Sequence, residues 1–271
     1  MAGVLYLVAT PIGNLADITK RAKQTLAQVD LIACEDTRHT LGLLNHLGIQ
    51  KQLLSYHKHN EKQSSYQILS LLAEGKSIAL VSDAGMPCIS DPGAYLVSQA
   101  RAAGAQVTII PGASAVVSAV ALAGIEADGF VFLGFLKGSE KQKRDRLAYY
   151  LTEPMPLVIY SAPHDVKKEL ALLAQTLGAR EVFIIKEITK VYEKVAVGIL
   201  GEVGPEEEKG EFVLVISGYE QQELVGDKDI IEELTFLLSF GLSKRDASAI
   251  TSRYLQISKK RVYDLCLAKF G

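Results

Sequence analysis

The sequence has few of the residues on which secreted or metal-centred proteins depend. Its three cysteines, Cys34, Cys88 and Cys266, are odd in number and far apart, which excludes a disulfide framework and a zinc-ligand spacing. Free cysteines predict a reducing, cytoplasmic location. The first residues, Met1-Ala-Gly, lack the basic segment and cleavage site of a signal peptide. The five histidines offer no convincing ligand set, so we expect no metal.

Long hydrophobic runs are also lacking, with one apparent exception. Residues 102–125 contain no charged side chain, and a stretch of this length could span a bilayer. Gln106 and Pro111-Gly112 interrupt this stretch, and its second half is rich in Ala, Ser, Val and Gly. We interpret it as a buried strand, a turn and a buried helix. The protein is therefore expected to have no contact with a membrane.

Net charge is low, at −2 over 271 residues, which excludes a uniformly basic protein that coats nucleic acid. The charge is unevenly distributed, however. Residues 241–271 carry seven Lys and Arg against two Asp, a local charge of +5 on an otherwise acidic chain. This asymmetry predicts a polyanionic partner that is met at one end of the molecule.

Short apolar runs alternate with helical patterns through most of the chain. Strands are predicted at residues 4–9, 31–34, 78–81 and 107–110, with helices near 18–29, 37–47, 61–73 and 94–103. A second set follows, with strands at 131–135, 157–160, 182–186, 195–200 and 212–217 and helices near 141–151 and 166–177. This alternation predicts an α/β protein whose first sheet is mostly parallel and covered on both faces.

The last segment follows a polar linker around residues 221–227 and is purely helical in pattern. Ser243 and Ser258 are predicted to cap two helices joined by a short turn. Their shared core is expected to contain Ala247, Ile250, Tyr254, Ile257, Val262, Leu265 and Cys266. The pattern is helix-turn-helix-like and favours nucleic-acid contact, although a helical cap that packs on the body is the alternative. The predicted domains are residues 1–112, 113–222 and 227–271.

Three loops rich in glycine and proline follow the ends of predicted strands. They contain Thr10-Pro-Ile-Gly-Asn14, Ser82-Asp-Ala-Gly-Met-Pro87 with Ser90-Asp-Pro-Gly93, and Pro111-Gly-Ala-Ser-Ala115. Ligands collect beyond the carboxyl ends of parallel strands, so three such loops together predict a cleft for a small ligand. None of them is a Rossmann or P-loop motif, which disfavours those nucleotide-binding folds.

Several of these segments together resemble one known family. Leu7-Val-Ala-Thr-Pro-Ile-Gly-Asn-Leu-Ala-Asp17, Ala33-Cys-Glu-Asp-Thr-Arg38, Val81-Ser-Asp-Ala-Gly-Met-Pro87, Ile110-Pro-Gly-Ala-Ser-Ala115 and Phe132-Leu-Gly-Phe135 are similar to segments of the bacterial 16S ribosomal RNA cytidine 2′-O-ribose methyltransferases, in the tetrapyrrole methylase superfamily. The resemblance covers nearly the whole chain. It implies two α/β domains, a homodimer, S-adenosylmethionine in the cleft between the domains, and a decoding-centre cytidine of 16S ribosomal RNA as substrate.

The resemblance also implies which residues line the cofactor. They are Pro11, Asp83, Ala84, Gly85, Met86, Ser114 and Ala115, with Tyr160, Ile188 and Val213 as walls for the adenine. Asp83 could otherwise cap a turn and Ser114 a helix, and Val213 could be an ordinary core residue.

A ribose hydroxyl is a poor nucleophile until it loses its proton, so a positioned base would help. Asp36 and Glu187 are the candidates, although Asp36 could equally be the N-cap of the helix that begins at Thr37. Basic side chains are the candidates for contacts with RNA phosphates. They are Arg38, Lys190, Lys143, Arg144, Arg245, Arg253, Lys259, Lys260 and Arg261.

Two other functions compete with RNA methylation. A methyltransferase for a small tetrapyrrole would share the body of the protein but would need no basic appendage. A helix-turn-helix regulator that senses a small molecule would use the tail, but the body is far larger than a sensor requires. The basic tail therefore favours an RNA 2′-O-methyltransferase.

Overall fold

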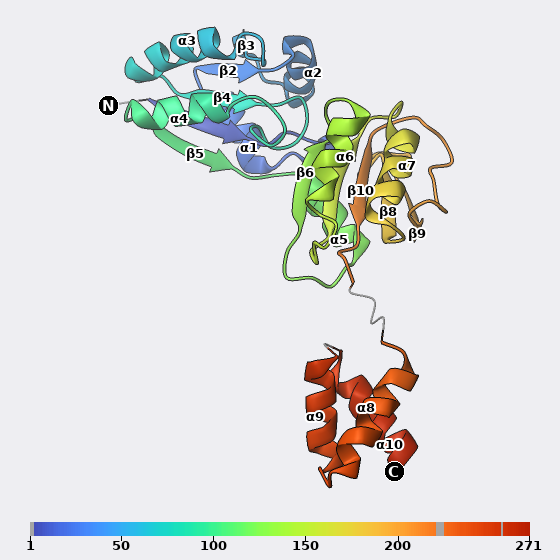
Figure 1. Ribbon diagram of the computed structural model, residues 1–271. Helices are drawn as coiled ribbons and strands as arrows, with labels where there is room; N and C mark the ends of the chain where they lie inside the picture. Colours follow the sequence, from blue (N-terminus) through green and yellow to red (C-terminus); the bar gives the residue numbers. More distant parts are fainter. Residues whose placement is uncertain (1–2, 221–224, 256) are drawn as a thin grey trace. The chain divides into compact units, whose positions relative to one another are not determined.

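The computed structural model describes residues 3–220, 225–255 and 257–271. The chain forms two compact units, Met1–Tyr219 and Glu220–Gly271. The first unit contains two five-stranded sheets, and the second is made of helices (Figure 1). The predicted α/β class with a helical tail is confirmed. The finer division of the first unit near residue 112 stays a prediction, and part of the predicted linker lies outside the described residues.

The first sheet is entirely parallel, in the order β3-β2-β4-β1-β5. Its elements in chain order are β1 (Val4–Val8), the 3₁₀ turn η1 (Leu15–Asp17), α1 (Lys20–Gln28), β2 (Leu31–Cys34), α2 (Thr37–Leu47), β3 (Leu53–Ser55), α3 (Glu61–Ala73), β4 (Ile78–Val81), α4 (Ala94–Ala102) and β5 (Gln106–Ile110). Strands β2 and β4 are buried along their whole length, which explains their continuous apolar runs.

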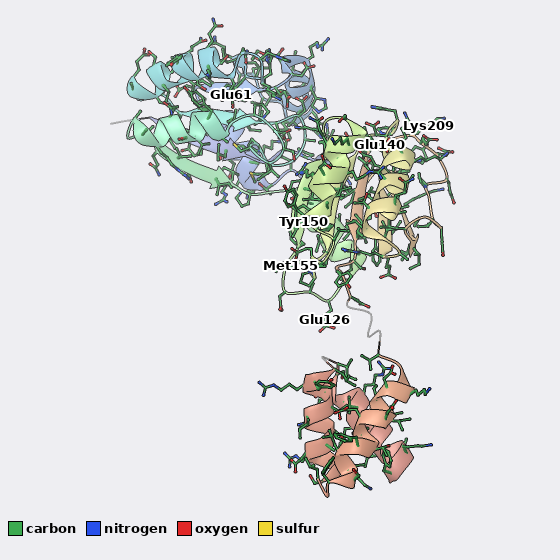
Figure 2. All side chains as sticks on the ribbon, in the orientation of Figure 1. Glu61, Glu126, Glu140, Tyr150, Met155 and Lys209 are labelled. Atoms are coloured by element: carbon green, nitrogen blue, oxygen red, sulfur yellow. The ribbon has the colours of Figure 1, made fainter. Side chains whose placement is uncertain are left out.

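Helices cover both faces of this sheet, as the alternating pattern predicted. Leu26 of α1 and Leu44 of α2 pack on one face, and Ile68 of α3 and Leu96 of α4 pack on the other. Glu61 at the start of α3 (Figure 2) accepts a hydrogen bond from the backbone nitrogen of Gly93, at 3.0 Å, and so holds the loop before α4 against α3.

The second sheet has the order β6-β7-β10-β8-β9 and is mixed, because only β6 and β7 are parallel. Its elements are α5 (Ala115–Ala123), β6 (Val131–Phe135), α6 (Glu140–Ala148), β7 (Leu157–Ser161), α7 (Val166–Leu177), β8 (Glu181–Lys186), β9 (Lys194–Ile199) and β10 (Phe212–Ile216). Val116 and Ala119 of α5 pack against Val158 and Val213 on one face. Helices α6 and α7 cover the other face. Helix α5 therefore begins at the edge of the first sheet and belongs to the core of the second.

The predicted elements of this unit are present with shifts of one to three residues at their ends, and one strand was missed. Strand β3 is three residues long, half-buried and at the sheet edge, so its pattern is too short to stand out. The uncharged stretch 102–125 forms the end of α4, then β5 and α5, as expected. No helix within the described residues is both long enough and apolar enough to cross a membrane.

The second unit packs α8 (Asp227–Ser239), α9 (Lys244–Tyr254) and α10 (Lys259–Phe270) around a small apolar core. Its buried members are Ile230, Leu234, Ala247, Ile257, Val262 and Cys266. Ser243 and Ser258 cap α9 and α10 as predicted, while α8 was not separately recognised. Ile250 and Tyr254 were wrongly assigned to the core, because they are 43% and 72% exposed. Helix α8 instead contributes Ile230 and Leu234 to this core.

A buried ion pair joins α6 to α7 beneath the second sheet. The Lys143 ammonium lies 2.7 Å from Glu169 Oε1, and the Ser161 hydroxyl donates to Glu169 Oε2 at 2.6 Å. The Glu169 side chain is only 5% exposed, and that of Lys143 17%. Removing one partner of a buried pair leaves an uncompensated charge, which costs far more than the intact pair contributes.

We therefore expect Lys143→Met to lower the free energy of unfolding by about 3 kcal/mol. Adding Glu169→Gln should restore more than half of the loss, because the buried charge is then gone. Lys141→Met, an exposed position on the same helix, is the matched control. Denaturant unfolding measures all three variants, and equal effects of Lys143→Met and Lys141→Met would show that the pair is not structural.

Candidate active site

Two loops at the carboxyl edge of the first sheet are tied together by a backbone bridge. The Thr10 nitrogen donates to the Gly85 carbonyl at 2.9 Å, and the Gly85 nitrogen donates to the Thr10 carbonyl at 3.1 Å. The Thr10 hydroxyl also donates to the Ser82 carbonyl. Because β4, β1 and β5 are neighbours, the loops that follow them lie side by side, and this bridge fixes two of them.

Unusual backbone conformations gather on two loops. The non-glycine residues with positive φ in the described part of the chain are Cys88 (71°), Ser90 (67°), Glu187 (53°) and Thr189 (64°). The first pair follows β4 in the first lobe, which is the parallel sheet with its helices. The second pair follows β8 in the second lobe, which is the mixed sheet with its helices. Such conformations persist only where the surrounding structure holds them, and they cluster at functional sites.

The loop after β8 is held by a network of charges. The Lys190 ammonium lies 2.9 Å from both Glu187 Oε1 and Glu211 Oε2, and the Glu211 backbone nitrogen donates to Glu187 Oε1 at 2.8 Å. Burial alone would raise the pKa of Glu187, but the Glu211 backbone and Lys190 outweigh it and hold that pKa below its usual range. Burial likewise opposes the charge on Lys190, whose pKa is nevertheless raised by Glu211 and Glu187.

The same loop reaches across to the first lobe. The Thr189 hydroxyl donates to Asp17 Oδ2 at 2.6 Å. The aliphatic stem of Lys190 lies over Gly13, where a Cβ atom would come within 2.4 Å of Lys190 Cγ. Gly13 also has a φ of 145°, so this position requires glycine for both space and conformation.

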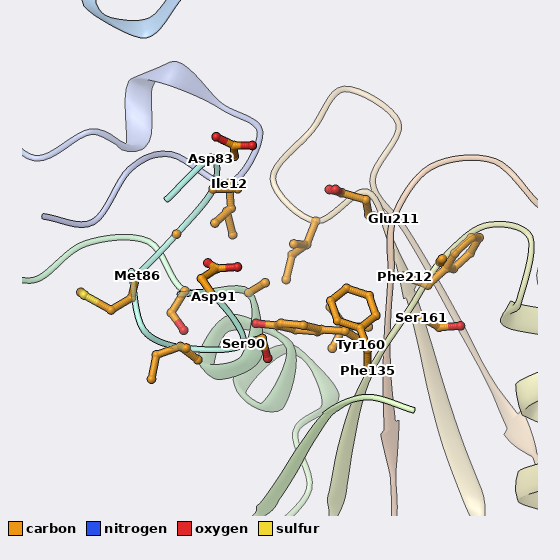
Figure 3. Close-up of a pocket in the computed structure, with 18 of the residues that line it drawn as sticks. Ile12, Asp83, Met86, Ser90, Asp91, Phe135, Tyr160, Ser161, Glu211 and Phe212 are labelled. Carbon is orange, nitrogen blue, oxygen red and sulfur yellow. The ribbon is translucent and has the colours of Figure 1, made fainter. Parts of the chain in front are cut away.

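A pocket of about 350 Å³ lies between these loops, which is within the size range of small-molecule sites. The first lobe contributes mainly the loop after β4, and the second contributes β7, β10 and the loop after β8 (Figure 3). The lining residues are Ile12, Asp83, Ala84, Gly85, Met86, Ile89, Ser90, Asp91, Ser114, Ala115, Phe135, Tyr160, Ser161, Ala162, Pro163, Ile188, Lys190, Glu211, Phe212 and Val213.

One wall of the pocket is aromatic and apolar. The Tyr160 ring packs edge-to-face against Phe132 and Phe135, with centroids 4.9 and 5.5 Å apart. Burial raises the pKa of Tyr160, so its hydroxyl stays protonated. Ile188 and Val213 extend this wall. A flat aromatic group such as a nucleobase would find both stacking surface and apolar contact here.

The opposite wall is acidic. Asp91 projects into the pocket from the loop after β4 (Figure 3). Burial, with the nearby charges of Glu35 and Asp83, raises the pKa of Asp91 to about 6, against a hydrogen bond from Ser82 that lowers it. Burial and Asp83 also raise the pKa of Glu35. These walls favour a ligand that is cationic on one side and aromatic on the other.

Most residues predicted to line a cofactor lie around this pocket. They are Asp83, Ala84, Gly85, Met86, Ser114, Ala115, Tyr160, Ile188 and Val213. Pro11 is buried and is not part of the lining, whereas its neighbour Ile12 is. Ser114 occupies the N-cap position of α5 without a capping hydrogen bond from its side chain, which leaves its hydroxyl available to a ligand. The roles of these residues stay predictions.

Neither predicted base lines the pocket. Asp36 caps α2 and pairs with Arg38 at 2.9 Å, and hydrogen bonds from Arg38 lower the pKa of Asp36 to about 2. Glu187 packs against Gly210 and is bonded to Lys190. Carboxylates that are already committed in this way are weak proton acceptors, so the structure gives no support to a proton-accepting role for either.

The predicted phosphate-binding residues divide into three groups. Lys190 and Lys143 are used within the protein by the pairs described above, and Arg261 bonds to Asp227 at 2.8 Å. Arg38 and Arg144 pair with nearby acids but remain exposed. The remaining members, Arg245, Arg253, Lys259 and Lys260, are exposed on the second unit. Charge alone could not separate these groups, because Glu169, Glu211 and Asp227, which engage Lys143, Lys190 and Arg261, are distant in sequence.

Sequence reasoning missed Asp91, Phe135 and Glu211 as lining residues. A signal for Asp91 was present, because Ser90-Asp-Pro-Gly93 continues a loop that had been recognised as part of the cleft. Phe135 ends β6 and Glu211 directly precedes β10.

The sequence matches known proteins along most of its length. Residues 4–204 match the family model "Tetrapyrrole (Corrin/Porphyrin) Methylases". The chain is 43% identical, over all of itself and 99% of its relative, to ribosomal RNA small subunit methyltransferase I of Pasteurella multocida (strain Pm70). The protein of the same name from Bacillus subtilis (strain 168) is 40% identical, with 97% of this chain and 93% of that one covered.

Solved structures show the same fold at low sequence identity. The methyltransferase CobJ superimposes with a TM-score of 0.62 and 19% identity, over 83% of this chain and 98% of that one. Uroporphyrin-III-C-methyltransferase from Thermus thermophilus gives a TM-score of 0.57 and 18% identity, over 79% and 94%. About a fifth of this chain thus has no counterpart in these two structures.

Proposed function

The chain belongs to the tetrapyrrole methylase family, among the ribosomal RNA small subunit methyltransferase I proteins, and we propose that it methylates the ribose 2′-oxygen of a decoding-centre cytidine in 16S ribosomal RNA. It is an S-adenosylmethionine-dependent enzyme that modifies small-subunit ribosomal RNA. The assignment of the ribose oxygen and of the cytidine as the target rests on the family resemblance of residues 7–17 and 33–38. A ribosomal substrate agrees with the cytoplasmic location that the cysteine content predicts.

The extent of the similarity carries this proposal. The tetrapyrrole methylase model ends at residue 204, and CobJ is covered almost completely by 83% of this chain. The ribosomal RNA methyltransferases match along the whole chain, including the helical unit. A tetrapyrrole methylase needs no such appendage, so the second unit supports an RNA substrate over a small tetrapyrrole. Membership of an enzyme family also removes the hypothesis of a ligand-sensing regulator.

The pocket fits the chemistry of S-adenosylmethionine. Tyr160, Ile188 and Val213 would hold the adenine, while Asp83 and the Ser114 hydroxyl would bind the polar groups of the ribose and the amino acid. The Asp83 carboxylate on the first-lobe wall would complement the ammonium group of this ligand. When bound, the cofactor supplies an electrophilic methyl group.

Positioning accounts for much of the catalysis that we propose. Methyl transfer from a sulfonium is an in-line displacement, so the acceptor oxygen must lie opposite the leaving sulfur. The bridge between Thr10 and Gly85 fixes the loops of the first lobe, and the contacts of Thr189 and Lys190 hold the second lobe against them. A rigid pocket of this kind lowers the entropic cost of alignment.

The second unit would supply contacts to RNA phosphates. Arg253, Lys259 and Lys260 are exposed and flank the turn between α9 and α10. Positive charges in the first turn of a helix oppose its dipole, which a bound phosphate would offset. Helix α8 carries mostly acidic residues in its first half, so the basic surface is local.

The reaction itself gives the first test. Small subunits that lack the modification, incubated with the chain and methyl-labelled S-adenosylmethionine, should gain one methyl group on the ribose of one cytidine. Nuclease digestion and mass spectrometry locate the methyl group. Subunits that already carry the modification are the control and should gain none. Methylation of a base, or of tetrapyrroles alone, would refute the proposal.

The triple variant Arg253→Gln, Lys259→Gln, Lys260→Gln tests the RNA surface. We expect the KM for small subunits to rise at least tenfold at 150 mM salt. Affinity for the subunits should also depend less steeply on salt concentration, because fewer phosphate contacts release fewer counterions on binding. The affinity for S-adenosylmethionine should be unchanged. The matched control replaces Lys23, Lys62 and Lys76, exposed lysines of the first unit, by Gln. Equal effects of the two variants would assign the loss to net charge alone.

We also propose that the protein is a homodimer, as the family resemblance implies. Exposed apolar side chains support this: Ile109 on the edge strand β5 and Val117 and Leu122 on α5 are 51%, 58% and 45% exposed. Light scattering should give a mass near 59 kDa, twice the 29.4 kDa of the chain, and Val117→Glu should give the monomer. A monomeric wild-type protein at micromolar concentration would contradict this.

A further inference from the structure

Asp91 is the one pocket carboxylate for which neither the fold nor the predicted roles account. It lies in the loop between β4 and α4, three residues before the helix begins, and is not the helix cap, which is Gly93. Figure 3 shows its side chain projecting into the space between this loop and the Tyr160 ring. Asp83 lies on the same wall, but its Oδ1 accepts a hydrogen bond from the backbone nitrogen of Asp36, at 3.1 Å.

The loop that carries Asp91 is held in place from several sides. Ser90 before it has a φ of 67°, and Gly93 after it has a φ of 134°. A Cβ atom on Gly93 would lie 2.6 Å from Cys88 Sγ, so the loop is tightly folded on itself. The Gly93 backbone nitrogen donates a hydrogen bond to Glu61 Oε1. The position of the Asp91 carboxylate is therefore set by the backbone before any ligand binds.

Among the residues that the structure describes, none is a cationic partner of Asp91. Among the described residues, its carboxylate forms no ion pair within 4.0 Å, and the groups that act on it are burial, Glu35, Ser82 and Asp83. Tyr160 faces it from β7, and the pKa of the Cys88 thiol is raised to about 11 by burial and by Asp91.

The other charged groups of the pocket are already engaged. Lys190 and Glu211 line the second-lobe side but are bonded to each other and, through Lys190, to Glu187. Among the described carboxylates that line the pocket, Asp91 is thus the one that has a raised pKa and forms no ion pair. Carboxylates used as general bases are tuned in this direction by burial and by like charges.

We propose that Asp91 is the general base that accepts the proton of the attacking ribose hydroxyl, an assignment that rests on the proposed function. The hydroxyl proton passes to the Asp91 carboxylate while the oxygen forms a bond to the methyl carbon. The bond between that carbon and sulfur breaks, and its electron pair stays on sulfur as a neutral thioether. The carboxylic acid then returns its proton to water.

The test compares Asp91→Asn and Asp91→Glu with the wild type in single-turnover methylation of small subunits at saturating S-adenosylmethionine. Asp91→Asn should be at least 100-fold slower, because a positioned base contributes about 10² to 10⁴ in rate. Asp91→Glu keeps a carboxylate and should fall between the two. Asp128→Asn, an exposed position in the loop before β6, is the matched control and should react at the wild-type rate.

The dependence on pH separates a base from a merely structural group. The wild-type rate should rise tenfold per pH unit below about 6 and level off above it, as Asp91 ionises. This limb should be missing from Asp91→Asn. A variant within threefold of the wild type, or one that keeps the limb, would overturn the proposal. So would a defect that disappears at higher S-adenosylmethionine, since Asp91 would then be a cofactor-binding group.

Stability of the unliganded protein gives a readout independent of activity. The folded pKa of Asp91 lies above its unfolded value of about 3.8, so its contribution to stability is full below pH 3.8 and is lost as pH rises through about 6. Asp91→Asn should therefore melt at a higher temperature than the wild type at pH 8, with the difference shrinking by pH 5. An equal or lower melting temperature at pH 8 would contradict the burial on which the proposal stands.

Calorimetry with S-adenosylhomocysteine completes the design. Asp91→Asn should bind it with a Kd within threefold of the wild type, which shows that the pocket is intact. If the wild type itself methylates no RNA, the proposed function fails. If the wild type is active and Asp91→Asn is equally active, only the assignment of the base fails.

Discussion

The pair of backbone hydrogen bonds between Thr10 and Gly85 is the constraint on which the site depends. Parallel strands end at one edge of a sheet, and the order β4-β1-β5 brings their three loops together. Hydrogen bonding between two of these loops turns neighbouring chain segments into a single rigid wall. That wall carries Asp83 and Asp91, and α5 begins at its border before it enters the core of the second sheet. One helix thus links the geometry of the two lobes.

The second lobe supplies a complementary surface held by charge rather than by strand pairing. Lys190 neutralises Glu187 and Glu211 and lays its aliphatic stem on Gly13, so its ammonium is used within the protein. Thr189 adds a hydrogen bond to Asp17. The strained backbone at Glu187 and Thr189 is the cost of bringing Ile188 to the pocket between these anchors. An acidic wall therefore faces an aromatic and apolar one, which suits a cationic ligand with a nucleobase.

Much of the fold followed from sequence patterns because most strands are apolar runs near a glycine or proline, as in Leu157–Ser161 directly after Pro156. The pocket loops could be recognised for the same reason. Two features could not be predicted, since each depends on contacts between distant segments. Lys143 could not be distinguished from a phosphate-binding residue without knowing that it pairs with Glu169. Tyr254 was wrongly predicted to lie in the helical core, to which α8 contributes Ile230 and Leu234 instead. Asp36 had the sequence context of a base, but the structure shows it paired with its neighbour Arg38.

We propose that both reactants meet in the pocket between the lobes, with Asp91 beside the acceptor oxygen. A crystal structure of the protein with S-adenosylhomocysteine and an oligonucleotide containing the target cytidine tests it most directly. We expect the adenine to lie against Tyr160 and Val213, the sulfur to face the first-lobe wall, and the ribose 2′-oxygen to lie within hydrogen-bond distance of Asp91. A cofactor bound outside this pocket, or a ribose oxygen facing another acid or water alone, would contradict it.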